Sequence, residues 1–268
     1  MYDVVADHSF RLVWGSIRKT PRSLNSLGFI IMTIKDIRKK LQKLGNEEKA
    51  NVLQRFFKTG PGEYGDGDVF IGVRVPELRK LVKEYPAITL KEAMQFLRSS
   101  IHEERMLALL ILVSKYKKGN EAVKKRIYEL YLQNTRFINS WDLVDVSAQH
   151  IVGAFLKNKS KEPLYRLAKS NSLWERRIAI LSTFHFIKLD DYKETLKISE
   201  ILLTDEQDLI HKAVGWMLRE IGKRHILSEE TFLKKYYKSM PRTMLRYAIE
   251  KFPESKRKKY LRGDYSCD

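Results

Sequence analysis

Five short segments with a similar residue pattern recur along the chain. Each has a charged residue in its second position, followed mostly by aliphatic or small residues. The second positions are 40, 32, 35 and 34 residues apart. A period of this length is typical of α-solenoids built from helix pairs, and it is most like that of HEAT repeats. The segments are Glu104–Ala108, Val144–Ala148, Arg176–Ile180, His211–Gly215 and Leu245–Ile249.

The remaining sequence also has helical periodicity. Apolar residues recur at i, i+3, i+4 and i+7, as at Met106, Leu109, Leu110 and Val113, and alternating strand patterns are nearly absent. The helices are expected to break at Gly60–Gly62, Pro86, Gly119–Asn120, Lys161–Pro163, Asp190–Asp191, Thr204–Asp205, Pro241 and Pro253. The sequence therefore predicts an all-α fold, an α-solenoid of HEAT-like repeats.

The second positions of the five segments predict a column of charge. They are Arg105, Asp145, Arg177, Lys212 and Arg246. Equivalent positions of a solenoid stack along one concave surface, so four basic side chains would line a groove that a single carboxylate interrupts. A basic column of this kind suits the phosphates of duplex DNA.

The overall charge agrees with a polyanionic partner. The chain has 51 Lys and Arg against 33 Asp and Glu, a net charge of +18. Nucleic acid is the first expectation and an anionic membrane surface the alternative. The apolar run Leu27–Met32 is too short to span a bilayer. Cys267 is the only cysteine, which excludes a disulfide framework and a thiolate metal site and fits a reducing cytoplasm.

Asp145 is the exception in the basic column, and two interpretations remain open. The carboxylate forms a plain salt bridge with Arg177 of the next repeat, or it meets a positive group of a ligand. Trp141 lies four residues before Asp145, and Trp216 lies four residues after Lys212, so each tryptophan shares a helix face with a member of the column. Although a tryptophan in a solenoid helix is usually core, two of them near a lone acid favour a functional site.

The ends of the chain differ from its body. Residues 1–31 contain four basic residues, only two acids and no clear helical period, whereas a patterned helix follows from Met32. We expect residues 1–31 to be a dispensable extension, with a transit peptide as the alternative. Residues 32–262 are expected to form the repeat domain, and residues 263–268 a tail.

Three ordered motifs resemble a known family. They are Asn139–Asp145, Leu173–Ile180 and His211–Glu220, supported by Phe70–Arg79 and by Pro241–Ile249. Together they resemble the AlkD family of DNA alkylation-repair glycosylases, which are built from HEAT-like repeats. The resemblance covers roughly residues 33–262.

The resemblance implies an enzyme that excises cationic alkylated purines, chiefly N7-methylguanine and N3-methyladenine, from duplex DNA without flipping the base into a pocket. Matched by motif, the catalytic residues are Asp145, Trp141 and Trp216. The resemblance places Arg177 near the DNA backbone at the lesion. We also expect a cytoplasmic monomer with no cofactor, and the lack of thiolates and of clustered histidines predicts that no metal is bound. The other expected DNA-binding residues are Lys212, Arg246, Arg105, Arg219 and Arg242.

Some positions depart from the family pattern. Ser140 stands where some members have a second tryptophan, and Phe56 stands where some have tyrosine. The glycine-rich loop Gly60–Asp68 lacks the Gly-Lys-Ser/Thr of a phosphate-binding loop. Two other classes of function therefore stay open: a non-catalytic repeat protein that binds DNA structure, and a scaffold for an acidic partner.

Overall fold

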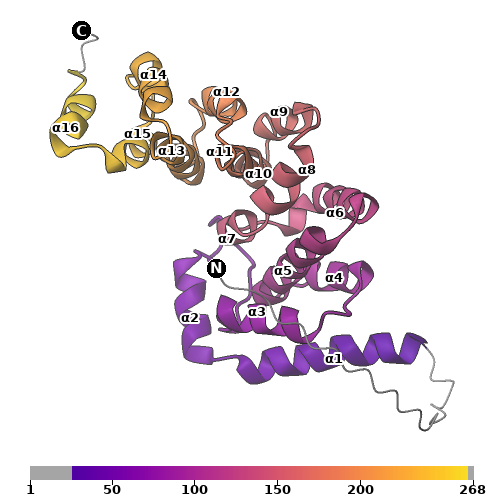
Figure 1. Cartoon of the computed structure of the whole chain (residues 1–268). Helices are drawn as coiled ribbons and strands as arrows, with labels where there is room; N and C mark the ends of the chain where they lie inside the picture. The colour runs from indigo at the N-terminus through magenta and orange to yellow at the C-terminus, as the bar shows by residue number, and fades with distance from the viewer. Residues whose placement is uncertain (1–25, 265–268) are drawn as a thin grey trace, which may run out of the picture.

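In a computed structural model, residues 26–264 are described, with side chains from residue 34 onward, and their regular elements are helices joined by loops and turns (Figure 1). The only β-type pairing in this part of the chain is an isolated bridge between Val69 and Ile101. The α-helices are α1 Ser26–Leu44, α2 Glu47–Phe56, α3 Val75–Glu84, α4 Leu90–Leu97, α5 His102–Lys118, α6 Glu121–Gln133, α7 Trp141–Asp145, α8 Ala154–Leu156, α9 Glu162–Ala168, α10 Leu173–Ser182, α11 Phe184–Ile187, α12 Lys193–Ile201, α13 Asp208–Gly222, α14 Ile226–Tyr236, α15 Arg242–Ala248 and α16 Glu254–Arg262. A π-helix, η2, spans Gln149–Gly153, and short 3₁₀ turns span Thr135–Phe137 and Ile249–Lys251. The predicted all-α fold class is confirmed.

The helices form two layers of a curved array. Along the inner side of the arc, α5, α7, α10, α13 and α15 pack successively against one another (Figure 1). Behind them, α4, α6, α9, α12 and α14 pack on the inner helices as an outer layer. All five repeated sequence segments begin in inner helices, one in each. The predicted HEAT-like repeat is therefore confirmed.

The helix boundaries follow local sequence signals. All eight predicted breaks fall between helices or at a helix start. The Asn120 side chain accepts a hydrogen bond of 3.0 Å from the Val123 amide and so caps α6. Pro241 and Pro253 stand immediately before α15 and α16, because proline is compatible with a helix start but not with a helix interior.

The ends of the described region differ in how they compare with expectation. The first helix begins at Ser26 rather than at Met32. The remainder of the expected extension, residues 1–25, lies outside the described residues, as do residues 265–268 of the expected tail. Helix α16 ends at Arg262 because Gly263 adopts a left-handed φ of 84°, which favours glycine.

Close packing between α13 and α15 depends on Gly215. A Cβ atom placed on this residue would lie 2.4 Å from the Met244 carbonyl oxygen and 2.5 Å from the Tyr247 Cβ. Both distances are well below van der Waals contact, and one involves backbone that cannot rotate away. A residue without a side chain is therefore required where these two inner helices meet.

The first prediction concerns this contact. Gly215→Ala should push α15 away from α13 and lower the free energy of unfolding by about 1–3 kcal/mol, the usual cost of overpacking. Urea unfolding followed by circular dichroism measures the change. Gly60→Ala is the matched control, since its nearest neighbour is the flexible Glu63 side chain, and it should change the free energy by less than about 0.5 kcal/mol. Equal stability of the two variants would contradict the prediction.

Candidate active site

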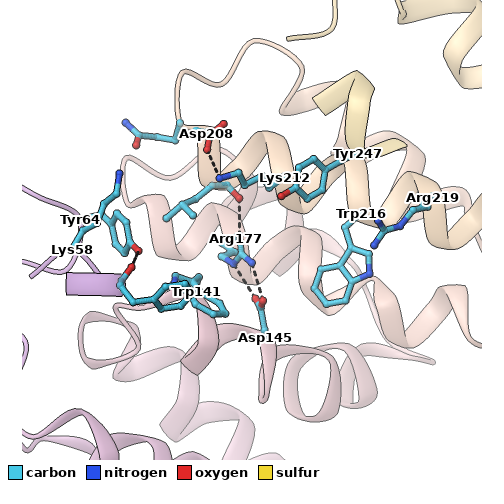
Figure 2. A pocket seen from close by; sticks show the side chains of 13 residues that line it. Lys58, Tyr64, Trp141, Asp145, Arg177, Asp208, Lys212, Trp216, Arg219 and Tyr247 are labelled. Atoms are coloured by element: carbon cyan, nitrogen blue, oxygen red, sulfur yellow. Dashed lines mark hydrogen bonds and ion pairs between the residues drawn. The ribbon is translucent and has the colours of Figure 1, made fainter. Parts of the chain in front are cut away.

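A cleft of about 620 Å³ opens on the inner layer and gathers most of the predicted site residues. It is lined by side chains of α7, α10, α13 and α15 and by the loop that follows α2 (Figure 2). Six of the nine predicted residues line it: Trp141, Asp145, Arg177, Lys212, Trp216 and Arg219. The structure thus brings together all three residues expected to be catalytic.

Asp145 and Arg177 form a two-point ion pair at the base of this cleft. Arg177 donates from Nε to Oδ1 at 2.9 Å and from Nη2 to Oδ2 at 2.8 Å (Figure 2). Its Nη1 donates to the Leu209 carbonyl oxygen at 2.6 Å. The predicted salt bridge between repeats therefore exists, and it joins α7, α10 and the start of α13. Asp145 nevertheless keeps 18 % of its side chain exposed and lines the cleft, so contact with a positive group of a ligand stays a prediction.

The surroundings of Asp145 also set its acidity. Burial raises the pKa of the Asp145 carboxyl above its usual 3.8, because a buried carboxylate loses hydration. The Arg177 guanidinium opposes this shift, and the nearby Asp142 carboxylate adds to it. The ion pair thus stabilises a buried charge at a position facing the cleft.

The two tryptophans are held by aromatic packing on different walls of the cleft. Trp141 stacks on Phe57 with ring centroids 5.0 Å apart, and the Phe56 ring contacts it edge-on at 5.9 Å. Trp216 packs on Phe184 of α11 at 5.8 Å. Both indoles are half-buried, so one part of each ring is fixed in protein and another part faces the cleft.

Two further cations of the cleft, Lys212 and Arg219, are paired with acids. Lys212 contacts Asp208, one turn earlier on α13, at 2.6 Å. Arg219 forms an ion pair with Glu250, which follows α15. Arg177, Lys212 and Arg219 are therefore held in position by carboxylates, and part of each side chain lines the cleft.

The structure corrects the position expected for Arg105. Its side chain is 5 % exposed, and its Nη2 donates to the buried Asp68 carboxylate at 2.6 Å. Nη1 donates to the carbonyl oxygens of Ser99 and Ser100. Arg105 therefore points into the protein and not into the groove, because the loop after α2 returns Asp68 to this position.

Arg242 and Arg246 lie outside the cleft. Both are exposed on α15, and Arg242 donates to the Leu261 carbonyl oxygen at 2.7 Å. Their position on an inner helix is compatible with contact to a long ligand that extends beyond the cleft, and their predicted role in DNA binding stays a prediction.

The cleft also contains residues that were not among the predicted site residues. Lys58 and Tyr64 come from the loop after α2, and Tyr247 comes from α15 (Figure 2). The Tyr64 ring lies edge-on to Trp174 at 6.1 Å, which places the glycine-rich loop against α10. The only sequence signal for this was an aromatic residue among glycines, because nothing in a helical period indicates where a loop folds back.

The two positions that depart from the family pattern differ in exposure. Phe56 is 63 % exposed and lines the cleft. Ser140 is 2 % exposed immediately before α7, where its side chain makes no capping hydrogen bond. Position 56 therefore offers no hydroxyl at the rim of the cleft, because its residue is phenylalanine and not tyrosine. Ser140 is enclosed by protein.

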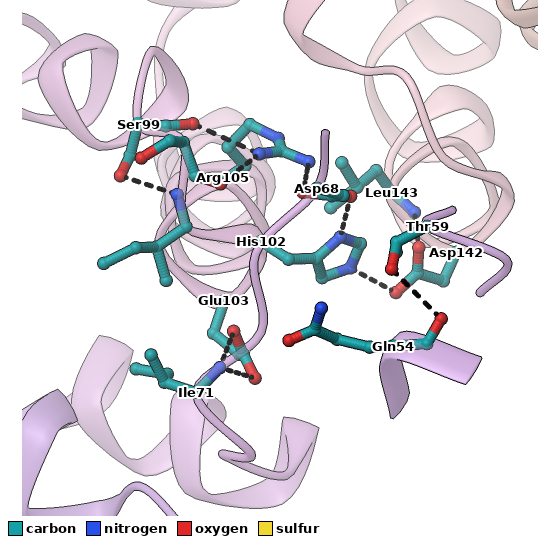
Figure 3. A network of polar contacts seen from close by, with 12 residues as sticks. Gln54, Thr59, Asp68, Ile71, Ser99, His102, Glu103, Arg105, Asp142 and Leu143 are labelled. Atoms are coloured by element: carbon teal, nitrogen blue, oxygen red, sulfur yellow. Dashed lines mark hydrogen bonds and ion pairs between the residues drawn. The ribbon is translucent and has the colours of Figure 1, made fainter. Parts of the chain in front are cut away.

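Behind the cleft, a buried polar network fixes α7. His102 contacts Asp68 through Nδ1 and Asp142 through Nε2, each at 2.8 Å (Figure 3). Asp142 lies between Trp141 and Asp145 in the first turn of α7. The imidazole ring also stacks on Phe70 with centroids 4.3 Å apart. Four of the segments that form this part of the protein therefore meet at His102: the loop before α3, α5, α7 and, through Phe57, the end of α2.

The network is charged. Burial disfavours the imidazolium, but hydrogen bonds to Asp142 and Asp68 outweigh this and raise the pKa of His102 to about 9. Burial alone would raise the pKa of Asp68, but His102 and the Arg105 guanidinium hold it below its usual value. At neutral pH His102 is therefore protonated between the Asp68 and Asp142 side chains.

Within residues 26–264, no group of three or more His, Cys, Asp or Glu side chains could hold a metal ion. In the same part of the chain, no helix is long and apolar enough to cross a membrane.

An all-helical repeat protein with a basic, aromatic-lined cleft on its inner layer is the class that the fold and the site define. The sequence model of the DNA alkylation repair enzymes matches residues 37–252. The chain therefore belongs to the DNA alkylation repair enzyme family. The expected family is thus confirmed.

Solved structures agree with the fold. A predicted DNA alkylation repair enzyme from Enterococcus faecalis superposes with a TM-score of 0.60 at 18 % identity, covering 78 % of this chain and 97 % of that one. AlkD2 from Streptococcus mutans superposes with a TM-score of 0.50 at 19 % identity, covering 78 % of this chain and 99 % of that one. A search of curated proteins finds no significant match to the sequence.

The second prediction follows from the charge on His102. Because its folded pKa is raised from 6.5 to about 9, protonated His102 stabilises the fold fully below about pH 6.5, and this stabilisation is lost as the pH rises through about 9. The free energy of unfolding should therefore fall by up to about 3 kcal/mol between these pH values. Urea unfolding at several pH values measures it.

His102→Gln is the control for this prediction. The variant should be less stable at pH 6.5 and should lack the fall toward pH 9, because glutamine does not titrate. If the wild type and the variant lost stability in parallel over this range, another group would be responsible.

Proposed function

We propose that this protein is a DNA glycosylase that excises cationic alkylated purines, such as N7-methylguanine and N3-methyladenine, from duplex DNA. The observation that carries the proposal is the placement of the Asp145 carboxylate in one cleft with two indole rings. The proposal includes cleavage without extrusion of the base, a cytoplasmic location and action as a monomer with no metal or cofactor.

The chemistry of the substrate explains why a carboxylate is the central group. A purine alkylated at N7 or N3 carries positive charge and is already a good leaving group, so little acid catalysis at the base is needed. As the glycosidic bond breaks, positive charge develops on the deoxyribose as an oxocarbenium ion. A carboxylate beside the sugar stabilises this charge more than it stabilises the ground state.

The geometry around Asp145 suits this role. Arg177 holds both carboxylate oxygens, so the negative charge need not reorganise during the reaction. The exposed parts of Trp141 and Trp216 offer indole faces, and each adds a cation–π attraction of about 0.5–2 kcal/mol to a desolvated cation. Lys212 and Arg219 on α13 are placed to contact phosphates and to set the register of the DNA.

The third prediction tests the reaction. Duplex DNA carrying N7-methylguanine is incubated with the protein, and release of free base is measured by chromatography. The wild type should release the base, and Asp145→Asn should do so about 10²- to 10³-fold more slowly, the usual effect of removing one electrostatic contact to a transition state.

Asp36→Asn is the matched control, because this exposed aspartate of α1 lies far from the cleft along the chain and does not line it. It should release base at the wild-type rate. DNA binding by the wild type without release of base would instead favour a non-catalytic protein that recognises DNA structure. Equal rates for Asp145→Asn and the wild type would disprove the assigned mechanism.

The fourth prediction concerns the acid side of the pH profile. Because burial raises the pKa of Asp145, protonation should remove its charge at a higher pH than for an ordinary aspartate with a pKa of 3.8. The single-turnover rate of base release should therefore fall on acidification before the pH reaches 3.8. Rates are measured with DNA at saturating protein concentration, and a rate that stays constant down to that pH would contradict the prediction.

A further inference from the structure

Lysine and histidine side chains also gather beyond the cleft, on or just after α5, η2, α8 and α11. They are Lys117 on α5, His150 on η2, Lys157 just after α8, His185 on α11 and Lys188 just after α11. We call this set the second cationic surface. The three lysines are exposed, and the two histidines are half-buried.

A chain of contacts joins the second cationic surface to the cleft. Trp216 lines the cleft and packs on Phe184, and the Lys188 ammonium lies 4.3 Å from the centroid of the same Phe184 ring. Lys188 Nζ also donates to the Gln149 side chain at 2.6 Å. The ammonium group therefore lies one aromatic ring away from Trp216 of the cleft.

The lysine charges of this surface act on its two histidines, which are neutral at pH 7. Burial, and after it the charges of Lys117 and Lys188, lower the pKa of His150 to about 4. The pKa of Lys188 is lowered by burial and by Arg224 and Lys117. Glu220 is the carboxylate that opposes this effect at Lys188, but it is already paired with Lys223 and Arg224. An anion bound here would relieve the repulsion.

The direction from the cleft to this surface is the informative feature. Arg177 lies within α10, and Lys188 lies eleven residues later, just beyond α11, so the second cationic surface is displaced from the cleft toward the C-terminal end of these two helices. The groove of a solenoid runs across its stacked helices, so a displacement along a helix crosses the groove. A displacement in this direction therefore leads from one strand of a duplex lying in the groove to the other strand.

We propose that the second cationic surface binds phosphates of the second DNA strand, opposite the strand whose deoxyribose lies at Asp145. This rests on the proposed function in that it takes duplex DNA as the ligand. The surface supplies binding and orientation, because two lines of contact on different strands fix the rotation of the duplex about its own axis. Rotation in turn decides which sugar faces Asp145.

The fifth prediction is a change in the salt dependence of binding. Affinity for an undamaged duplex and for one of its strands is measured by fluorescence anisotropy at several salt concentrations. Each phosphate contact contributes about 0.9 to the slope of log affinity against log salt for a duplex. The double variant Lys117→Gln with Lys188→Gln should lower the duplex slope by about 1.8 and leave the single-strand slope unchanged.

Two sets of variants control for charge and folding. Lys91→Gln with Lys197→Gln makes the same change in net charge on the outer helices α4 and α12, and it should keep the wild-type slope. Lys117→Arg with Lys188→Arg keeps both charges and should also keep it. Thermal unfolding by circular dichroism checks that the variants are folded.

The outcomes separate this proposal from the proposed function. An unchanged duplex slope in the double glutamine variant overturns the proposal, and an equal loss on single strands shows that the surface follows the same strand as Asp145. If the wild type binds the duplex but releases no base, only the proposed catalysis fails, since the slopes remain measurable. If it does not bind duplex DNA, both proposals fail.

Discussion

Each inner helix of this protein must bury its apolar side against the next repeat, and the arrangement of the site follows from that constraint. A helix pair has too little core to be stable alone, so successive repeats stack and complete one another's hydrophobic surface. Stacking leaves one line of positions on each inner helix facing the groove. The Asp145–Arg177 ion pair forms on this line because positions 145 and 177 are equivalent in adjacent repeats. Gly215 shows how closely the helices approach where they meet.

The charges of the groove are more ordered than the net charge of +18 suggests. Three cations of the cleft that come from the inner helices each have an acid partner: Arg177 has Asp145, Lys212 has Asp208, and Arg219 has Glu250. Such pairs contribute little to stability when exposed, but they restrict long side chains to fewer orientations. At the second cationic surface the lysines lack this compensation. The two regions therefore differ. The paired cations of the cleft are held in place before a ligand binds, whereas the lysines of the second cationic surface repel one another.

Much of this site could be predicted from sequence, because repeats place equivalent residues at regular intervals. The spacing of the five segments identified the inner helices, and the i, i+4 relation placed Trp141 with Asp145 and Trp216 with Lys212. Arg105 shows where this reasoning fails. It occupies the equivalent position, but a non-repeating loop returns Asp68 beside it and turns the side chain inward. Lys58 and Tyr64 were not predicted for the same reason, since the return of a loop has no period.

Helix α7 consists of five residues, Trp141–Asp145, and carries both an indole and the carboxylate of the cleft. A helix this short has no stability of its own in water, because the ordering of its first turn is not repaid by enough hydrogen bonds. Its geometry therefore depends on residues that are far away in the chain. Asp68 acts on it through His102, Phe57 packs on Trp141, and Arg177 forms an ion pair with Asp145. Substitutions at those distant positions would therefore alter the site itself, although none of these residues needs to contact DNA. A survey of natural variants that counts only cleft residues would underestimate how much of this chain is under functional constraint.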